Sequence, residues 1–175
     1  MRTIGEIGPD TDWARALEGV EVVVHCAARA HIMREQAADP SALYRSVNVD
    51  GTRRLAAQAA SHGVKRLVYL SSVKAAGERS APGRPLKVSD PPAPEDAYGV
   101  SKREAELALL EVSAATGLET VIIRPPLVYG PGVKGNFLRL MGAIARGWPL
   151  PLGAFENRRS MISLANLTDF ISLCV

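Results

Sequence analysis

Three short apolar runs, rich in β-branched residues, dominate the hydrophobic pattern of the chain. They cover residues 20–28 (VEVVVHCAA), 65–71 (KRLVYLS) and 119–124 (ETVIIR). Continuous runs of this kind are typical of strands that are buried on both faces. Gly63 and Gly117 precede the second and third runs, at positions where a preceding helix would end in a left-handed residue. The pattern therefore predicts three buried strands.

Two segments between these runs have the spacing of amphipathic helices. They cover residues 41–61 and 98–116, and in the second Leu107, Leu110 and Val112 are mixed with charged residues. The order strand, helix, strand, helix, strand favours a parallel sheet with crossover helices. We therefore predict an α/β, doubly wound fold.

Two further segments complete the pattern. Residues 79–97 are rich in Pro, Gly, Ser and Asp, which predicts a long surface loop of a kind that is usually functional. A second irregular stretch follows residue 124 and leads to a short amphipathic helix, predicted at 136–146, and then to a last Pro/Gly-rich loop.

Composition narrows the class of protein. The 175 residues, 47% of them apolar, suit one compact domain. The net charge is +3 with scattered basic residues, which does not favour nucleic-acid binding. Cys26 and Cys174 stand in apolar runs without metal-ligand spacing, so we expect buried, reduced thiols and no metal site. Without a membrane-length apolar segment or a signal peptide, we expect a cytoplasmic protein that does not contact a membrane.

The candidate chemistry is the pair Tyr98 and Lys102 at the start of a predicted helix, 26 positions after Ser72. Residues four apart share a helix face, so the ammonium is expected to lie near the phenol and to lower its pKa. Such a phenol can shuttle a proton for an alcohol/carbonyl pair. Ser72 ends a predicted strand, where ligands bind in open α/β sheets, and can hydrogen-bond the same substrate oxygen. Taken alone, an exposed Tyr/Lys pair also has a purely structural explanation.

The companions of this pair give it a family context. In order, six segments resemble motifs of the extended short-chain dehydrogenase/reductases of the NAD-dependent epimerase/dehydratase type. They are GEI (5–7), HCAA (25–28), NVDGT (48–52), SSVKAAG (71–77), RPPLVYGP (124–131) and RSMISLAN (159–166). The resemblance implies a Rossmann-like sheet, a bound NAD or NADP, a UDP-sugar substrate, and a homodimer in the full-length protein.

The resemblance also implies roles for individual residues. The catalytic residues are Ser72, Tyr98 and Lys102, and no metal is involved. The cofactor-binding residues are Glu6, Ile7, Ala27, Ala28, Asn48, Tyr98, Lys102 and Pro125, and the substrate-binding residues are Ser72, Asn136 and Arg159.

Several of these residues have a structural alternative. We interpret His25, at the end of a buried strand, as a satisfied core histidine. Asn48 can instead cap or brace a helix, Ser72 can merely terminate its strand, and Arg159 can be a solvated charge. Residues 130–135 match GxGxxG, but the second position is a proline and the segment follows the third strand, so we reject it as the dinucleotide fingerprint.

Departures from the family pattern narrow the prediction. No glycine-rich turn follows a first strand, so at least one βαβ unit of ~30 residues is expected to be missing before Met1, and the C-terminal part is short. We predict a partial NAD(P)-binding domain with the catalytic residues at 1–130 and the start of a substrate-binding region at 131–175. Val73 and Lys74 stand where the family's 4,6-dehydratases carry an Asp-Glu pair, and Leu127 stands where galactose-type 4-epimerases place an Asn. These departures argue against a 4,6-dehydratase, and they weaken the case for plain UDP-glucose/UDP-galactose epimerisation.

Three functional hypotheses follow. The first is an NAD(P)-dependent enzyme that acts at C4 of a UDP-sugar, as a 4-ketoreductase or 4-epimerase, to make precursors of surface polysaccharide. The second is a truncated Rossmann-like domain without catalytic activity that binds only a partner or cofactor. The third is an NAD(P)-sensing regulator on the same fold.

Overall fold

The structure is a computed structural model that describes residues 3–30, 39–81, 83–133, 135–150 and 158–175. It divides into two compact units, Met1–Arg124 with Cys174–Val175, and Pro125–Leu173. Each unit is described by itself below.

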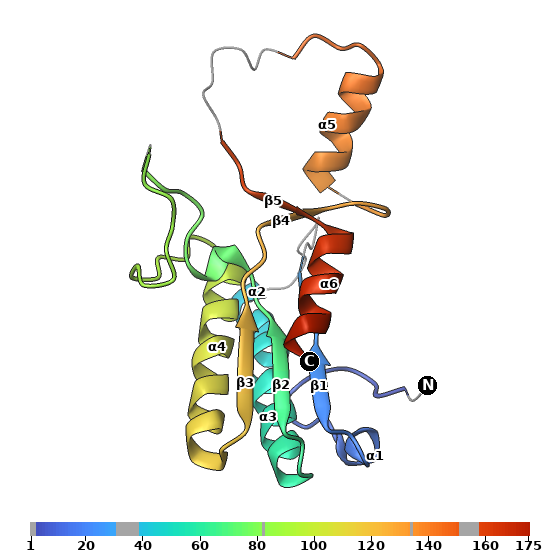
Figure 1. Ribbon diagram of the computed structural model, residues 1–175, viewed down its shortest axis with the longest axis vertical. Coiled ribbons are helices and arrows are strands. Elements are labelled where there is room, and N and C mark those ends of the chain that lie inside the picture. The colour runs from blue at the N-terminus through green and yellow to red at the C-terminus, as the bar shows by residue number, and fades with distance from the viewer. Residues whose placement is uncertain (1–2, 31–38, 82, 134, 151–157) are drawn as a thin grey trace. The chain divides into compact units, whose positions relative to one another are not determined.

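A three-stranded parallel sheet forms the centre of the first unit (Figure 1). Its strands are β1 (Val22–His25), β2 (Arg66–Leu70) and β3 (Glu119–Ile123), in the order β1-β2-β3. Val23, Leu67 and Thr120 lie side by side across the three strands. All three predicted strands exist, although each is shorter than its apolar run.

Helices connect these parallel strands. Between β1 and β2 the chain forms α2 (Pro40–Tyr44), the π-helical turn η1 (Arg45–Asp50) and α3 (Gly51–Ser61) without a break. Between β2 and β3 it forms the short 3-10 helix η2 (Val73–Ala75) and the long α4 (Ala97–Thr116), which ends at the left-handed Gly117. The short helix α1 (Ala14–Leu17) precedes β1. This arrangement confirms the α/β prediction, and a π-helical turn interrupts the single helix predicted for 41–61.

The core of the first unit lies between the sheet and the pair α3 and α4, which pack against each other on one side of it (Figure 1). Small residues such as Ala56, Ala59 and Ala105 are fully buried and allow this close packing. The larger core side chains are Trp13, Leu17, Leu55, Val64, Leu67, Tyr69, Leu109, Val112 and Leu118.

The second unit contains two short parallel strands, β4 (Leu127–Tyr129) and β5 (Met161–Ser163), with α5 (Gly135–Ala145) and α6 (Leu164–Cys174). Gly130 follows β4 with φ +147, and a Cβ there would lie 3.1 Å from the Leu164 Cβ, so this close approach requires glycine. The sequence analysis found α5 but treated the rest as irregular. Strands of three residues are too short to show a periodicity. Lys134 of the rejected glycine motif and residues 151–157 of the last predicted loop lie outside the described residues.

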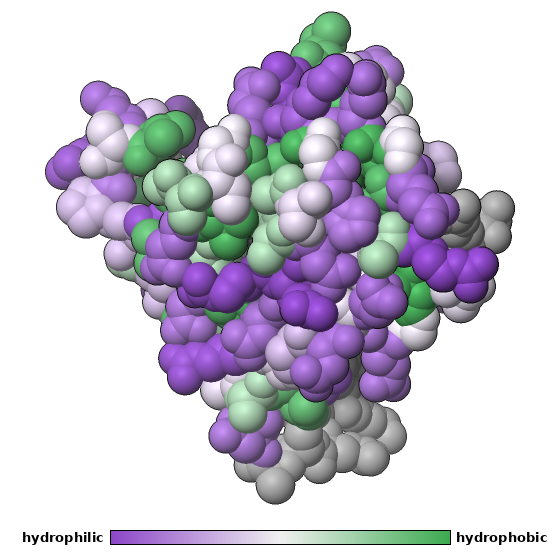
Figure 2. All heavy atoms as spheres, turned by 90° about the horizontal axis from the view of Figure 1, so that it is seen from below, coloured by the Kyte–Doolittle hydropathy of each residue, from purple (hydrophilic) through white to green (hydrophobic). Residues whose placement is uncertain are grey.

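Among the residues that the structure describes, no helix is long and apolar enough to cross a membrane, and no group of three or more His, Cys, Asp or Glu could hold a metal ion. Hydrophilic side chains cover most of the face in Figure 2, with apolar ones in small separate groups. The expected burial of both cysteines is wrong, because β1 ends at His25 and leaves Cys26 exposed, while Cys174 is half-buried.

Candidate active site

Ser72 lies just beyond the carboxyl end of β2. The Ser71 amide still donates to the Ile123 carbonyl at 2.7 Å, and the chain then turns away from the sheet into η2. The Ser72 hydroxyl caps η2 by accepting from the Lys74 amide at 3.2 Å. This cap fixes the hydroxyl at the edge of the sheet where ligands of open α/β sheets bind.

Tyr98 lies in the first turn of α4, close to η2. The Asp96 side chain begins the helix by accepting from the Gly99 amide at 2.6 Å. A Cβ on Gly99 would lie only 2.7 Å from the Lys74 carbonyl oxygen, so glycine lets η2 approach the helix backbone. The Ser72 hydroxyl lies near enough to the Tyr98 phenol to lower the pKa of that phenol. The structure thus brings together the first two predicted catalytic residues.

A second link between η2 and α4 was missed from sequence. The Lys74 ammonium lies 2.6 Å from Asp96 Oδ2 and 2.8 Å from Glu78 Oε1. The sequence analysis considered Lys74 only as a departure from the dehydratase pattern. The contact joins residues 22 positions apart through a Pro-rich loop, and no local pattern predicts such a pair.

Lys102 has a different environment from the one predicted. It is 1% exposed, donates to the Leu70 carbonyl oxygen at 2.6 Å, and lies 4.0 Å from the centre of the Tyr69 ring. Burial lowers its pKa to about 8, against an opposing effect of the Glu106 carboxylate. Lys102 therefore lies beneath the end of β2 as a buried ammonium held by a carbonyl and an aromatic face.

The prediction that Lys102 lowers the pKa of the Tyr98 phenol is wrong. Burial raises the pKa of Tyr98, and the nearby Ser72 hydroxyl and the charge of Lys74 oppose this effect. The four-residue spacing correctly places Tyr98 and Lys102 on one helix face, but the Leu70 carbonyl and the Tyr69 ring draw the ammonium toward β2. The phenol is thus held in its protonated form at neutral pH.

His25 is a satisfied core histidine, as interpreted from sequence. Its Nε2 is 3.0 Å from the Thr52 hydroxyl, and its ring stacks on Tyr69 with centroids 5.6 Å apart. Burial, together with the charge of Lys102, lowers its pKa to about 4, so the imidazole is neutral at pH 7. It supports Tyr69, the side chain on which the Lys102 ammonium lies.

Asn48 braces two segments of the first unit. Its Oδ1 accepts from the Arg29 amide at 2.7 Å, and its Nδ2 donates to the Arg29 carbonyl at 3.1 Å and to the Ser101 hydroxyl at 3.0 Å. The π-helical turn η1 carries this buried side chain between the segment after β1 and helix α4. The brace that the sequence analysis considered is present, and a direct role in cofactor binding stays a prediction.

Two of the predicted cofactor-binding residues, Ile7 and Ala27, line the same hollow of about 530 Å³ beside β1. Ile7 packs on Gly51, where a Cβ would lie 2.7 Å from the Ile7 Cγ2 atom. Glu6 is exposed and Ala28 is half-buried.

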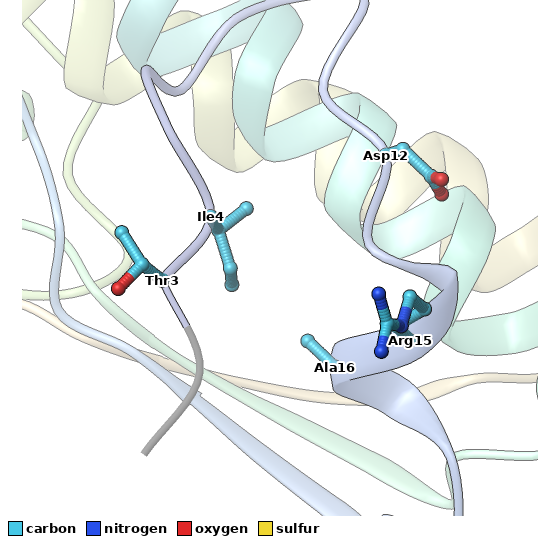
Figure 3. Close-up of a pocket in the computed structure, with 5 residues that line it drawn as sticks. All are labelled: Thr3, Ile4, Asp12, Arg15 and Ala16. Carbon is cyan, nitrogen blue, oxygen red and sulfur yellow. The ribbon is translucent and has the colours of Figure 1, made fainter.

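A second hollow of about 310 Å³ lies at the N-terminal segment (Figure 3). Its lining residues are Thr3, Ile4, Asp12, Arg15 and Ala16, and Ile4 and Arg15 point toward each other across it. It contains none of the predicted site residues.

The remaining predicted residues belong to the second unit. Pro125 begins that unit and is half-buried, Asn136 is exposed at the start of α5, and Arg159 is exposed before β5. Because each unit is described by itself, the roles of these three residues toward cofactor and substrate stay predictions.

Known proteins resemble this chain over almost its whole length. The model of the NAD dependent epimerase/dehydratase family matches residues 3–173. A UDP-glucose 4-epimerase of Vibrio cholerae is 49% identical over 173 residues, covering 98% of this chain and 53% of that protein. The N-acetyl-alpha-D-glucosaminyl-diphospho-ditrans,octacis-undecaprenol 4-epimerase of Escherichia coli O157:H7 is 34% identical, covering 96% of this chain and 49% of that protein.

A solved structure extends the likeness to the fold. The dTDP-glucose 4,6-dehydratase DesIV of Streptomyces venezuelae, crystallised with NAD, is 29% identical with a TM-score of 0.76 and covers 91% of this chain and 49% of that chain. This likeness confirms the predicted Rossmann-like fold. The chain spans about half the length of these relatives.

Proposed function

The chain belongs to the NAD dependent epimerase/dehydratase family, and we propose that the protein inverts C4 of a UDP-linked sugar in an NAD-dependent reaction. The observation that carries this proposal is the placement of Ser72, at the carboxyl end of a parallel sheet, beside the first turn of α4 that carries Tyr98. The names of the Vibrio cholerae and Escherichia coli relatives, both 4-epimerases, support inversion at C4. A surface-polysaccharide precursor as product and a homodimeric state are part of the proposal.

The residues present fit the adenine end of NAD. The hollow beside β1 extends along the whole strand, and Ile7, Cys26 and Ala27 are among the residues that line it. Cys26 and Ala27 follow the carboxyl end of β1, where ligands of open α/β sheets bind. The apolar Ile7 and the small Ala27 leave room for a flat ring. When bound, NAD supplies a hydride acceptor and donor at its nicotinamide ring.

The side chains of this protein have the complementary task of moving a proton at the sugar oxygen. With NAD bound as hydride acceptor, Tyr98 in its phenolate form would accept the proton of the C4 hydroxyl, and the resulting phenol would return that proton to the same sugar oxygen. Ser72 holds the phenol and the sugar oxygen in line. The buried phenol holds its proton tightly, and the charge of Lys74 favours the phenolate. The Lys102 ammonium binds the Leu70 carbonyl oxygen and so holds the end of the strand that leads to Ser72.

The protonated Tyr98 phenol also fits the ketoreductase alternative. A protonated phenol is ready to donate to a forming C4 alkoxide, and this step completes the reduction of a 4-keto sugar. The two reactions differ in redox balance. An epimerase regenerates its NAD in each turnover, whereas a ketoreductase consumes one reduced cofactor for each product.

The test is a turnover assay on the protein encoded by the complete gene. It is incubated with NAD and, separately, with UDP-glucose, UDP-galactose and their N-acetylamino counterparts, and the C4 epimers are followed by proton NMR. We expect interconversion without net change in cofactor absorbance at 340 nm, and a loss of at least about 100-fold in kcat for Tyr98→Phe, the range of general acid–base catalysis. The thermal midpoint of the variant should stay near that of the wild type.

The other outcomes assign the alternatives. A parallel incubation supplies reduced cofactor and a UDP-4-keto sugar. Turnover in that incubation alone, with stoichiometric loss of the reduced cofactor, would establish the ketoreductase. Cofactor binding without turnover of any sugar would favour the regulator or the inactive domain. Unchanged turnover in Tyr98→Phe would refute the proposed chemistry.

A further inference from the structure

Glu106 is a fully buried carboxylate in α4, one turn after Lys102. Its Oε1 accepts from the Ser71 hydroxyl at 2.7 Å and from Arg124 Nε at 2.7 Å. Its Oε2 accepts from Arg124 Nη2 at 2.6 Å and from Arg103 Nη1 at 3.0 Å. A buried carboxylate is tolerated only when its oxygens are paired in this way.

The partners of Glu106 come from the ends of two different strands. Ser71 follows β2 and directly precedes Ser72, and Arg124 follows β3. The Ser71 amide also donates to the Ile123 carbonyl, so the two strand ends are already joined to each other. The carboxylate adds α4 to this junction through a bidentate arginine contact of fixed geometry.

We propose that Glu106 is a positioning residue for the reaction, because its carboxylate sets the spacing between the Ser72 end of β2 and the face of α4 that carries Lys102. This inference rests on the proposed function of Ser72 and Lys102. A hydrophobic residue of similar size could fill the same space, and replacing buried ion pairs in this way is often neutral for stability. What it could not supply is the directional contact to Ser71 and the negative charge.

The charge of Glu106 acts on the Lys102 ammonium as well. The titratable groups that face Lys102 are Glu106 on its own helix, Tyr69 from β2, His25 from β1 and the Cys26 thiol beyond it. Burial lowers the pKa of Lys102 to about 8, and Glu106 is the first of the groups that raise it. A neutral residue at 106 should therefore lower the pKa of Lys102 further.

Glu106 itself stays ionised over the pH range in which Lys102 titrates. Although burial raises its pKa, the hydrogen bonds from Arg124, Ser71 and Arg103 outweigh this effect and hold the pKa below its usual value. Glu106 therefore keeps its negative charge over the pH range in which Lys102 titrates. A different pKa of Lys102 in Glu106→Gln can then be attributed to the loss of this charge.

The experiment compares Glu106→Gln and Ser71→Ala with the control Glu111→Gln, which makes the same change at an exposed position of α4 paired with Arg53. In the protein from the complete gene, we expect kcat of Glu106→Gln to fall at least tenfold with KM within threefold, and the alkaline limb of its pH profile to move down by about half a unit or more. Glu111→Gln should leave both unchanged.

Two measurements keep this test independent of folding and of the proposed function. Ser71→Ala removes only one arm of the junction and should lower kcat three- to tenfold without changing NAD affinity. In this chain, NMR titration of lysine labelled at Cε, with the Lys102 signal assigned by Lys102→Met, should show a lowered Lys102 pKa in Glu106→Gln even if no sugar is turned over.

The inference is overturned if a folded Glu106→Gln keeps wild-type kcat and pH profile, or if Ser71→Ala keeps wild-type kcat while Tyr98→Phe abolishes turnover. Should Glu106→Gln not fold, Ser71→Ala decides the positioning role by itself. If Tyr98→Phe retains turnover, the proposed function fails, and the NMR titration still reports whether Glu106 controls Lys102.

Discussion

Replacing Lys102 by methionine should stabilise the chain, although it removes the hydrogen bond to the Leu70 carbonyl and the contact of the ammonium with the Tyr69 ring. Lys102 is 1% exposed, and methionine has a similar length without the charge. The substitution therefore removes a buried ammonium while keeping most of the packing against Tyr69.

The magnitude follows from the pKa of Lys102. Burial lowers it from 10.5 to about 8, and each unit corresponds to about 1.4 kcal/mol, so keeping the ammonium charged in the folded state costs about 3 kcal/mol. The variant also loses the hydrogen bond to the Leu70 carbonyl, which reduces the expected gain in stability by about 1 kcal/mol. We expect Lys102→Met to raise the free energy of unfolding by about 2 kcal/mol at pH 7.

The stability difference between Lys102→Met and the wild type depends on pH. The folded state releases the Lys102 proton near pH 8 and the unfolded state only near 10.5, so between these values the unfolded state binds more protons and the wild type gains stability as the pH rises. At pH 9.5 the cost of the ammonium falls to about 1.4 kcal/mol, and the gap between variant and wild type should shrink below about 1 kcal/mol.

The assay is urea unfolding of this chain and of Lys102→Met at pH 7 and pH 9.5, followed by fluorescence of Trp13 in the core. Lys65→Met is the matched control, because Lys65 is exposed and pairs with the exposed Glu21. It should change stability by less than about 0.5 kcal/mol at both pH values. A Lys102→Met chain that is less stable than wild type at pH 7, or a gap that does not narrow at pH 9.5, would refute the reasoning.

Three further predictions concern the residues that hold the site together. Gly99→Ala places a Cβ 2.7 Å from the Lys74 carbonyl and should destabilise the chain by about 2 kcal/mol in urea unfolding, whereas Gly142→Ala, in the open helix α5, should gain up to about 1 kcal/mol. Asn48→Ala removes the three hydrogen bonds of a buried side chain and should lower the free energy of unfolding by about 3 kcal/mol, seen as a lower urea midpoint at unchanged slope. The pKa of His25 is lowered from 6.5 to about 4, so as the pH falls the unfolded state takes up a proton before the folded state does. Between these two pH values the free energy of unfolding of the wild type should fall by up to about 3 kcal/mol relative to that of His25→Gln. A difference in the free energy of unfolding that does not change with pH would contradict this prediction.

Local patterns were sufficient for the main elements of the first unit. The β-branched runs predicted β1, β2 and β3, and the αL glycine at 117 correctly marks the end of α4. The pattern also predicted that Ser72 lies beyond the end of β2. These features depend on side-chain character within a few residues, which the sequence displays directly. The strands β4 and β5 have no such signal, because three residues are too few to show a period, and what defines these strands is their pairing across a long stretch of sequence.

The sequence by itself determined which residues line up for chemistry: an α/β framework, a serine at a strand end, and a Tyr/Lys pair on one helix face. Only the tertiary structure decided how the charges are distributed among them. In the folded chain the Lys102 ammonium donates to the Leu70 carbonyl, and Lys74 pairs with Asp96 near Tyr98. The Glu106 carboxylate accepts hydrogen bonds from Ser71, Arg103 and Arg124. The physical reason is that a buried charge is stabilised by whichever partners the fold brings within about 3 Å, and those partners come from segments far apart in the chain.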